Sequence, residues 1–167
     1  MPRLILLRHA KSDWPAGVAD HDRPLGKRGR RDAPLIGAAM AARALVPELA
    51  IVSTATRTRQ TWDLVKPALG PVPERFERAI YEAEPEAILA VIRAVDDGCG
   101  TLLIVGHNPG LELIAGFLSA KGLQRERMAE KFPTGALAVI DFGNGGWRDV
   151  RRGQGELALF LVPGGLG

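Results

Sequence analysis

Short apolar runs that alternate with amphipathic segments constrain the fold of this chain more than any other feature. Three runs, at 4–7, 49–52 and 101–105, hold almost no polar side chain. Continuous apolar runs of this length are typical of strands that are buried on both faces of a parallel sheet. The pattern therefore predicts three central strands with helices on both faces of the sheet.

Between these runs, apolar residues recur at spacings of three and four, which predicts amphipathic helices that pack against the sheet. The four apolar stripes are Leu35, Ile36, Ala39 and Met40; Thr58, Trp62, Val65 and Leu69; Ile88, Leu89, Ile92 and Val95; and Leu111, Ile114, Phe117 and Leu118. Pro34 is expected in the first turn of its helix or at a kink. Asn108 and Pro109 are expected to supply a cap and a first-turn proline for the fourth helix.

The C-terminal part of the chain has a different pattern. We interpret 136–142 and 157–162 as strands, with a glycine-rich turn at 143–146 and an extended segment at 147–151. Antiparallel strands of this kind are common at the edge of mixed sheets. The chain is therefore predicted to be α/β, a three-layer α/β/α sandwich with a mostly parallel central sheet and antiparallel edge strands near the C-terminus. Its length favours one domain over 1–167, since chains usually divide only beyond ~250 residues.

Composition excludes several classes of protein. The single cysteine, Cys99, excludes an internal disulfide and a cysteine-cluster metal site, and no apolar run reaches the ~18 residues of a membrane span. Because the N-terminal run lacks the cleavage region of a signal peptide, we expect a cytoplasmic protein. The 22 Lys and Arg barely exceed the 19 Asp and Glu, and the excess is concentrated in 1–31. So small and local an excess argues against nucleic acid and favours a positive rim around an anionic site.

Basic and imidazole side chains follow the predicted strands where each strand ends. Arg8 and His9 follow the first strand. Arg57 opens the helix after the second strand, and His107 follows the third. Ligands of open α/β sheets bind at this edge, where helix N-termini add positive dipole ends. One histidine after a strand is more often structural, but four such residues at one edge predict a phosphate site. Guanidiniums bind phosphate bidentately, and an unprotonated imidazole is a nucleophile for phosphoryl transfer.

Taken in order, the motifs at these positions resemble the histidine phosphatase superfamily, which includes the phosphoglycerate-mutase-like enzymes. Within it they are similar to the small phosphohistidine phosphatase branch. The resemblance spans about Leu4 to Val162 and rests on five segments: Arg8-His9-Ala10-Lys11-Ser12-Asp13-Trp14, Asp22-Arg23-Pro24-Leu25, residues 53–61, Gly106-His107-Asn108-Pro109-Gly110-Leu111-Glu112, and Phe132-Pro133-Thr134-Gly135-Ala136.

The resemblance implies a role for each site residue. His9 would be the nucleophile that becomes phosphorylated. Arg8 and Arg57 would hold the phosphoryl oxygens, and His107 would donate a further hydrogen bond to them. Further candidates for contact with the substrate are Lys11, Ser12, Arg23 and Asn108. The implied activity is that of a phosphatase without metal or cofactor, which acts through a phosphohistidine intermediate on phosphohistidine in a phosphorylated protein, or on a small phosphate ester.

Several points stay open at the level of sequence. The broader superfamily usually has glycine after the Arg-His pair, whereas this chain has Ala10, as the small branch often does. The superfamily also supplies a carboxylate general acid; Glu82 is the candidate here, and it is equally well explained as a solvated loop residue. Asp20-His21-Asp22 has the residue types of a metal site, but a charged surface loop has the same composition. A mutase of the same superfamily and a phosphate-binding module without turnover are the alternative functions.

Overall fold

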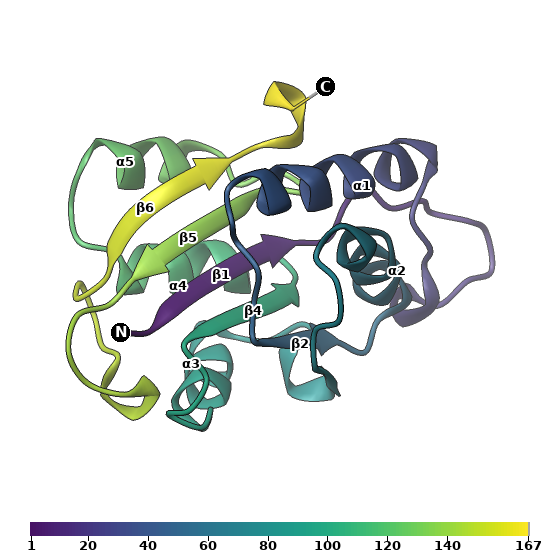
Figure 1. Ribbon diagram of the computed structural model, residues 1–167. Helices are drawn as coiled ribbons and strands as arrows, with labels where there is room; N and C mark the ends of the chain where they lie inside the picture. Colours follow the sequence, from purple (N-terminus) through teal and green to yellow (C-terminus); the bar gives the residue numbers. More distant parts are fainter. Residues whose placement is uncertain (167) are drawn as a thin grey trace.

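Six strands form one mixed sheet in the computed structural model, which describes residues 1–166 (Figure 1). The strands are β1 Arg3–Arg8, β2 Leu49–Ser53, β3 Glu74–Glu77, β4 Thr101–Gly106, β5 Leu137–Asp141 and β6 Glu156–Leu161. Their order across the sheet is β3-β2-β4-β1-β5-β6. The first four are parallel, whereas β5 pairs antiparallel with β1, and β6 pairs antiparallel with β5. The predicted α/β class with antiparallel strands from the C-terminal part is confirmed.

Helices cover both faces of the sheet, α1 and α2 on one face and α3, α4 and α5 on the other (Figure 1). Their bounds are α1 Lys27–Ala42, α2 Thr56–Val65, α3 Pro85–Arg93, α4 Gly110–Leu118 and α5 Leu123–Glu130. Each face has its own core: Met40 and Trp62 are fully buried on one, and Ile92 and Leu118 on the other. Within the described residues, no helix combines the length and the apolar character needed to cross a membrane.

Strand pairing at the centre of the sheet decides where the functional side chains lie. Residues 4–7 of β1 alternate between the two cores, and all four are fully buried. In the parallel pairing of β1 with β4, Arg8 lies opposite Gly106. The next residues along each segment are His9 and His107. These two histidines therefore leave the sheet at the same edge and next to each other.

The prediction of an extended segment at 147–151 is wrong. Trp147–Asp149 is a short 3₁₀-helix, and the Asp149 carboxylate accepts a hydrogen bond from the Gly146 N–H at 3.1 Å. The buried Trp147 indole N–H donates to the Cys99 carbonyl at 2.6 Å. This contact ties the turn to the core, and the chain turns there instead of forming another strand.

Two elements have no clear signal in the sequence. β3 reads Glu-Arg-Phe-Glu and lies at the edge of the sheet, where charged side chains are common because they discourage pairing with other chains. α5 is polar apart from a few positions, so it shows no apolar stripe.

The two proline predictions have different outcomes. Pro34 lies in the interior of α1, which excludes the first turn, one of its two predicted places. The Asn108 side chain accepts a hydrogen bond from the Glu112 N–H at 3.3 Å, but the N-cap residue of α4 is Pro109 and not Asn108. α4 itself begins at Gly110, so Pro109 precedes the first turn instead of lying in it.

Close packing of α1 on the segment after His9 gives a test of this fold. A Cβ at Gly29 would lie 2.1 Å from the Lys11 carbonyl oxygen, which is main chain and cannot move aside cheaply. Gly29→Ala should therefore lower the free energy of unfolding by about 1–3 kcal/mol. Thermal unfolding followed by circular dichroism measures this, together with the loss of activity expected when the backbone next to His9 shifts.

Gly116→Ala is the matched control for this variant. Gly116 is also in a helix, but a Cβ there meets nothing within 4 Å. Alanine should stabilise that helix by up to about 1 kcal/mol. Equal melting temperatures for the two variants would contradict the packing described here.

Candidate active site

Three segments bring the predicted residues to the carboxyl edge of the sheet. Arg8 ends β1 and His9 follows it. Arg57 is the second residue of α2, and His107 follows β4. The ring centroids of the two histidines lie 5.4 Å apart. His9, Arg57 and His107 are at most 6% exposed. The structure therefore brings the four residues together in a site with little access to solvent.

His9 is held in one tautomer by its own backbone. Its Nδ1 lies 2.7 Å from the Ala10 carbonyl oxygen, and because a carbonyl only accepts, Nδ1 carries the proton. Nε2 is then the nitrogen with a free lone pair. The main chain is fixed as well, since the Ala10 N–H donates to the Thr61 hydroxyl at 3.0 Å and the His9 N–H donates to the Gly106 carbonyl at 3.1 Å. This arrangement holds the imidazole ready for nucleophilic attack.

Each arginine is anchored through terminal nitrogens and leaves its Nε without a partner in the described part of the chain. Arg8 Nη1 donates to the Phe132 carbonyl at 3.0 Å, and Arg57 Nη1 donates to the Asp20 carbonyl at 2.7 Å. In both guanidiniums the buried Nε–H has no hydrogen-bond partner among residues 1–166. Buried N–H groups are seldom unpaired, so these two edges indicate a ligand with several acceptor oxygens, such as phosphate.

Ser53, at the end of β2, orients the second histidine. Its Oγ lies 2.8 Å from His107 Nε2 and also accepts the Ala55 N–H at 3.4 Å. In the tautomer in which the Ser53 hydroxyl donates to Nε2, the proton of the His107 ring is on Nδ1. Nδ1 is buried and has no partner in the described part of the chain. In this tautomer it adds a third N–H to those of the two arginines.

Burial and positive neighbours keep both imidazoles neutral. Burial is the main cause that lowers the pKa of His9 to about 3, and Arg57, Arg8 and Arg23 lower it further. Burial likewise lowers the pKa of His107 to about 3, and the neighbouring His9 and Arg57 act in the same direction. A neutral His9 keeps its lone pair at any pH at which a phosphatase normally works.

Asp20 is a functional residue that sequence reasoning missed in this role. Its carboxylate accepts hydrogen bonds from Arg23 Nη1 at 2.9 Å, from Arg57 Nη2 at 3.2 Å and from the Tyr81 hydroxyl at 2.5 Å. These donors hold the pKa of Asp20 far below its usual range, with the Tyr81 hydrogen bond the largest cause. Burial and the adjacent carboxylate raise the pKa of Tyr81 to about 12. No periodicity or motif links residues so far apart in sequence.

The loop after His9 brings two of the lesser candidates together. Arg23 is buried, and its Nη2 donates to the Ser12 hydroxyl at 2.5 Å. The exposed Trp14 ring covers this guanidinium, 3.3 Å from its central carbon. Lys11 is exposed, and its main chain packs against α1. In this structure Ser12 thus holds Arg23 in place, and Arg23 reaches the site through Asp20.

Asn108 and Glu82 border the site in different ways. The Asn108 amide donates to the Phe132 carbonyl at 3.0 Å, the same oxygen that anchors Arg8. Glu82 follows Tyr81, is exposed, and has a φ of 52°, in the left-handed region that a glutamate rarely adopts. Its carboxylate is therefore at the rim of the site and in water.

The loop residues that have the composition of a metal site are not grouped as one. Within residues 1–166 no three His, Cys, Asp or Glu side chains lie close enough together to hold a metal ion. Asp20 faces the two arginines and Tyr81 instead. His21 Nε2 lies 2.9 Å from the Thr54 hydroxyl, and its Nδ1 lies 3.6 Å from Asp22.

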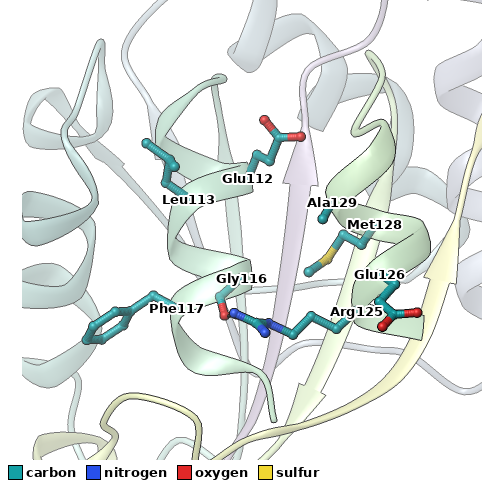
Figure 2. Close-up of a pocket in the computed structure, with 8 residues that line it drawn as sticks. All are labelled: Glu112, Leu113, Gly116, Phe117, Arg125, Glu126, Met128 and Ala129. Atoms are coloured by element: carbon teal, nitrogen blue, oxygen red, sulfur yellow. Dashed lines mark hydrogen bonds between the residues drawn. The ribbon is translucent and has the colours of Figure 1, made fainter. Parts of the chain in front are cut away.

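A cavity of about 520 Å³ lies between α4 and α5, and neither His9 nor His107 lines it (Figure 2). It is lined by Glu112, Leu113, Gly116, Phe117, Arg125, Glu126, Met128 and Ala129. Arg125 spans its floor and donates to the Gly116 carbonyl at 3.1 Å (Figure 2). Its two carboxylates would repel a phosphate, so the strand ends are the better place for the chemistry.

Comparison with known proteins identifies the family of this chain. A model of the histidine phosphatase superfamily (branch 1) matches residues 4–88, which include Arg8, His9 and Arg57. The uncharacterized protein Rv1276c of Mycobacterium tuberculosis is 40% identical over 161 residues, which cover 94% of this chain and 99% of that protein.

Two solved structures share the whole fold. One is a SixA protein from Agrobacterium tumefaciens, proposed to be a phosphohistidine phosphatase. It is 33% identical with a TM-score of 0.85, and the match covers 98% of this chain and 99% of that one. The other is the protein histidine phosphatase SixA complexed with tungstate, which is 20% identical with a TM-score of 0.82 and 99% coverage of both chains.

The two neutral histidines predict how stability depends on pH. Each has a pKa of about 3 in the folded chain, against about 6.5 when unfolded. The unfolded chain therefore binds more protons between these values, so the free energy of unfolding falls as pH drops from about 6.5 towards 3. Each histidine contributes up to about 1.4 kcal/mol per pH unit, which melting curves between pH 7 and 4 would measure.

Substitution separates these two residues from the other acid-sensitive groups. His9→Gln and His107→Gln should each flatten the decline in melting temperature on acidification. His21→Gln is the control, because this third histidine lies partly in solvent at the rim. An unchanged slope in the first two variants would show that neither histidine is held neutral by the fold.

Proposed function

Because the chain is a phosphatase of the histidine phosphatase superfamily and belongs to its small SixA-like branch, we propose that it hydrolyses phosphohistidine in proteins through a phosphorylated His9. The observation that carries this proposal is the lone pair of His9 Nε2 beside two buried guanidinium N–H groups without partners. A lone pair next to unpaired donors suits a phosphorus atom whose oxygens those donors bind.

The reaction has two steps. His9 Nε2 attacks the phosphorus and forms a P–N bond, while the bond to the leaving group breaks and its electron pair goes to the leaving atom. Arg8, Arg57 and His107 donate hydrogen bonds to the phosphoryl oxygens as their charge is redistributed. In the second step water attacks the phosphorus, His9 leaves with its lone pair restored, and inorganic phosphate is released.

The two arginines and His107 also support a reaction without metal. In many phosphatases a divalent cation neutralises the phosphoryl oxygens. Two guanidiniums and an imidazole N–H supply positive charge and hydrogen-bond donors at the equivalent place here. We therefore include independence from metal and cofactor in the proposal.

The leaving group favours phosphohistidine over alkyl esters. An alkoxide leaves only when it receives a proton, and a positioned acid is typically worth about 10²–10⁴-fold in rate. Asp20 is held ionised and has no proton to give. Imidazole is a much better leaving group, since its conjugate acid has a pKa of about 6.5. A site of this kind therefore suits a P–N bond.

A second candidate function depends on Glu82. Its left-handed backbone conformation at the rim is unusual for glutamate, and such outliers often occur at functional sites. If Glu82 protonates a leaving oxygen, the chain is a phosphomonoesterase for small phosphate esters. The mutase alternative requires the same acid, together with transfer of the phosphoryl group to a second substrate.

The nucleophile can be tested directly. His9→Ala should abolish turnover of p-nitrophenyl phosphate and of a histidine-phosphorylated peptide. The variant should keep its melting temperature within a few degrees, because the side chain lies beyond the end of β1 and outside the core. Wild-type enzyme quenched during turnover should carry acid-labile, alkali-stable phosphate at His9, located by mass spectrometry.

Two results would count against this mechanism. One is substantial activity in His9→Ala, and the other is an activity that EDTA removes and Zn²⁺ or Mn²⁺ restores. The proposal expects an unchanged rate in EDTA and inhibition by tungstate or vanadate. Transfer of the phosphoryl group to a second sugar phosphate, instead of water, would identify a mutase.

Substrate preference separates the two candidate functions. We expect phosphohistidine and p-nitrophenyl phosphate to be hydrolysed at least about 100-fold faster than phosphoserine and sugar phosphates, measured as kcat/KM. Glu82→Gln should change the rates on the two good substrates by less than about threefold. If alkyl phosphates are hydrolysed as fast as phosphohistidine and Glu82→Gln abolishes that activity, then Glu82 is the acid and the phosphomonoesterase is favoured.

A further inference from the structure

The Asp20 carboxylate lies among the arginines of the site, and it has no role in either step of the proposed reaction. Asp20 reaches Arg57 through both its carbonyl and its carboxylate, at 2.7 and 3.2 Å. Arg23 binds Oδ1, and Tyr81 binds Oδ2. A negative charge beside Arg57 weakens the binding of a phosphate dianion, so the position needs a compensating role.

The donors around Asp20 fix the carboxylate and still leave it an open side. Oδ2 has two partners, Tyr81 and Arg57, whereas Oδ1 has one, Arg23. A carboxylate oxygen can accept two hydrogen bonds. The side chain is 40% exposed, so a ligand can reach the carboxylate. The neighbouring rings are His21 and His107, both in edge contact with Tyr81.

Phosphohistidine supplies the partner that this open oxygen lacks. Its ring carries the phosphoryl group on one nitrogen and can carry a proton on the other. With that proton in place the ring leaves as neutral imidazole; without it the ring must leave as an imidazolate anion, a far stronger base. Phosphate esters have no N–H group in this place.

On the basis of the proposed function, we infer that Asp20 is a specificity-determining residue for phosphohistidine. It accepts a hydrogen bond from the distal ring N–H of the substrate and keeps that ring protonated while the P–N bond breaks. As His9 Nε2 bonds to phosphorus, the P–N electron pair goes to the ring nitrogen that held the phosphoryl group. The distal proton stays on the ring, so neutral imidazole is released and Asp20 stays ionised. No general acid is needed.

Tyr81 and Arg23 are positioning residues in this arrangement. Tyr81 comes from the segment before α3 and Arg23 from the loop before α1, so the carboxylate is held from two directions. Trp14 covers the Arg23 guanidinium and limits its freedom to move. The carboxylate therefore keeps one orientation without being buried.

Asp20→Asn tests the inference, because it keeps the shape and a carbonyl acceptor but removes the charge. At pH 8 we expect kcat/KM for a histidine-phosphorylated peptide to fall at least about tenfold, since an adjacent opposite charge shifts an imidazole pKa by about 1–3 units. The rate on p-nitrophenyl phosphate should fall less than the rate on the peptide, so that the ratio of the two kcat/KM values changes at least about tenfold, and inhibition by inorganic phosphate should stay the same or become tighter. The deficit on the peptide should shrink as pH is lowered to 6, where the substrate ring is protonated unaided.

Asp22→Asn is the matched control, because Asp22 is two residues away, is 69% exposed and lies 3.6 Å from His21. It should leave both rates and the pH profile unchanged. If Asp20→Asn lowers kcat/KM for both substrates equally at every pH and weakens inhibition by phosphate, Asp20 only positions Arg57 and the inference is wrong. A wild-type enzyme that hydrolyses p-nitrophenyl phosphate but not the peptide overturns the proposed substrate, whereas an unchanged peptide rate in Asp20→Asn overturns this inference alone.

Discussion

Parallel pairing of β1 with β4 is the constraint on which the site depends. The register places Arg8 opposite Gly106, so His9 and His107 leave the sheet together with ring centroids 5.4 Å apart. Both strands are buried on both faces, and a slip of one residue would exchange every side chain between the two cores. Core packing on either side of the sheet therefore determines the distance between the two histidine side chains, which follow the ends of these strands.

The site concentrates positive charge where little water can reach it. Guanidiniums are costly to bury, and the structure offsets this cost by anchoring Arg8 to the Phe132 carbonyl and Arg57 to Asp20. The histidines respond differently, because an imidazole can lose its proton and an arginine cannot. Burial among positive neighbours thus keeps both imidazoles neutral beside two guanidiniums, and the proposed phosphate binding and nucleophilic attack both depend on this arrangement.

Sequence patterns predict the parts of this site that depend on strand ends. Apolar runs locate β1, β2 and β4, and the residues that follow them include Arg8, His9, Arg57 and His107. The same reasoning misses β3, because a charged edge strand has no apolar run. It also treats Asp20 as part of a solvated loop. The contact of Asp20 with Tyr81 joins residues 61 positions apart, and only the folded chain brings them within hydrogen-bond distance.

The residues that the sequence predicts and those that it misses differ in how the fold positions them. Side chains at strand ends have positions set by the sheet, and in the proposed reaction they hold the phosphoryl group. Asp20 and Tyr81 come from the loop before α1 and the segment before α3, where the chain can change without disturbing the sheet. Residues that contact the leaving group can therefore differ between enzymes that share one phosphoryl-binding site. In this chain the loop contributes an ionised carboxylate instead of an acid, and under the proposed function this difference favours a P–N bond over a P–O bond as the substrate.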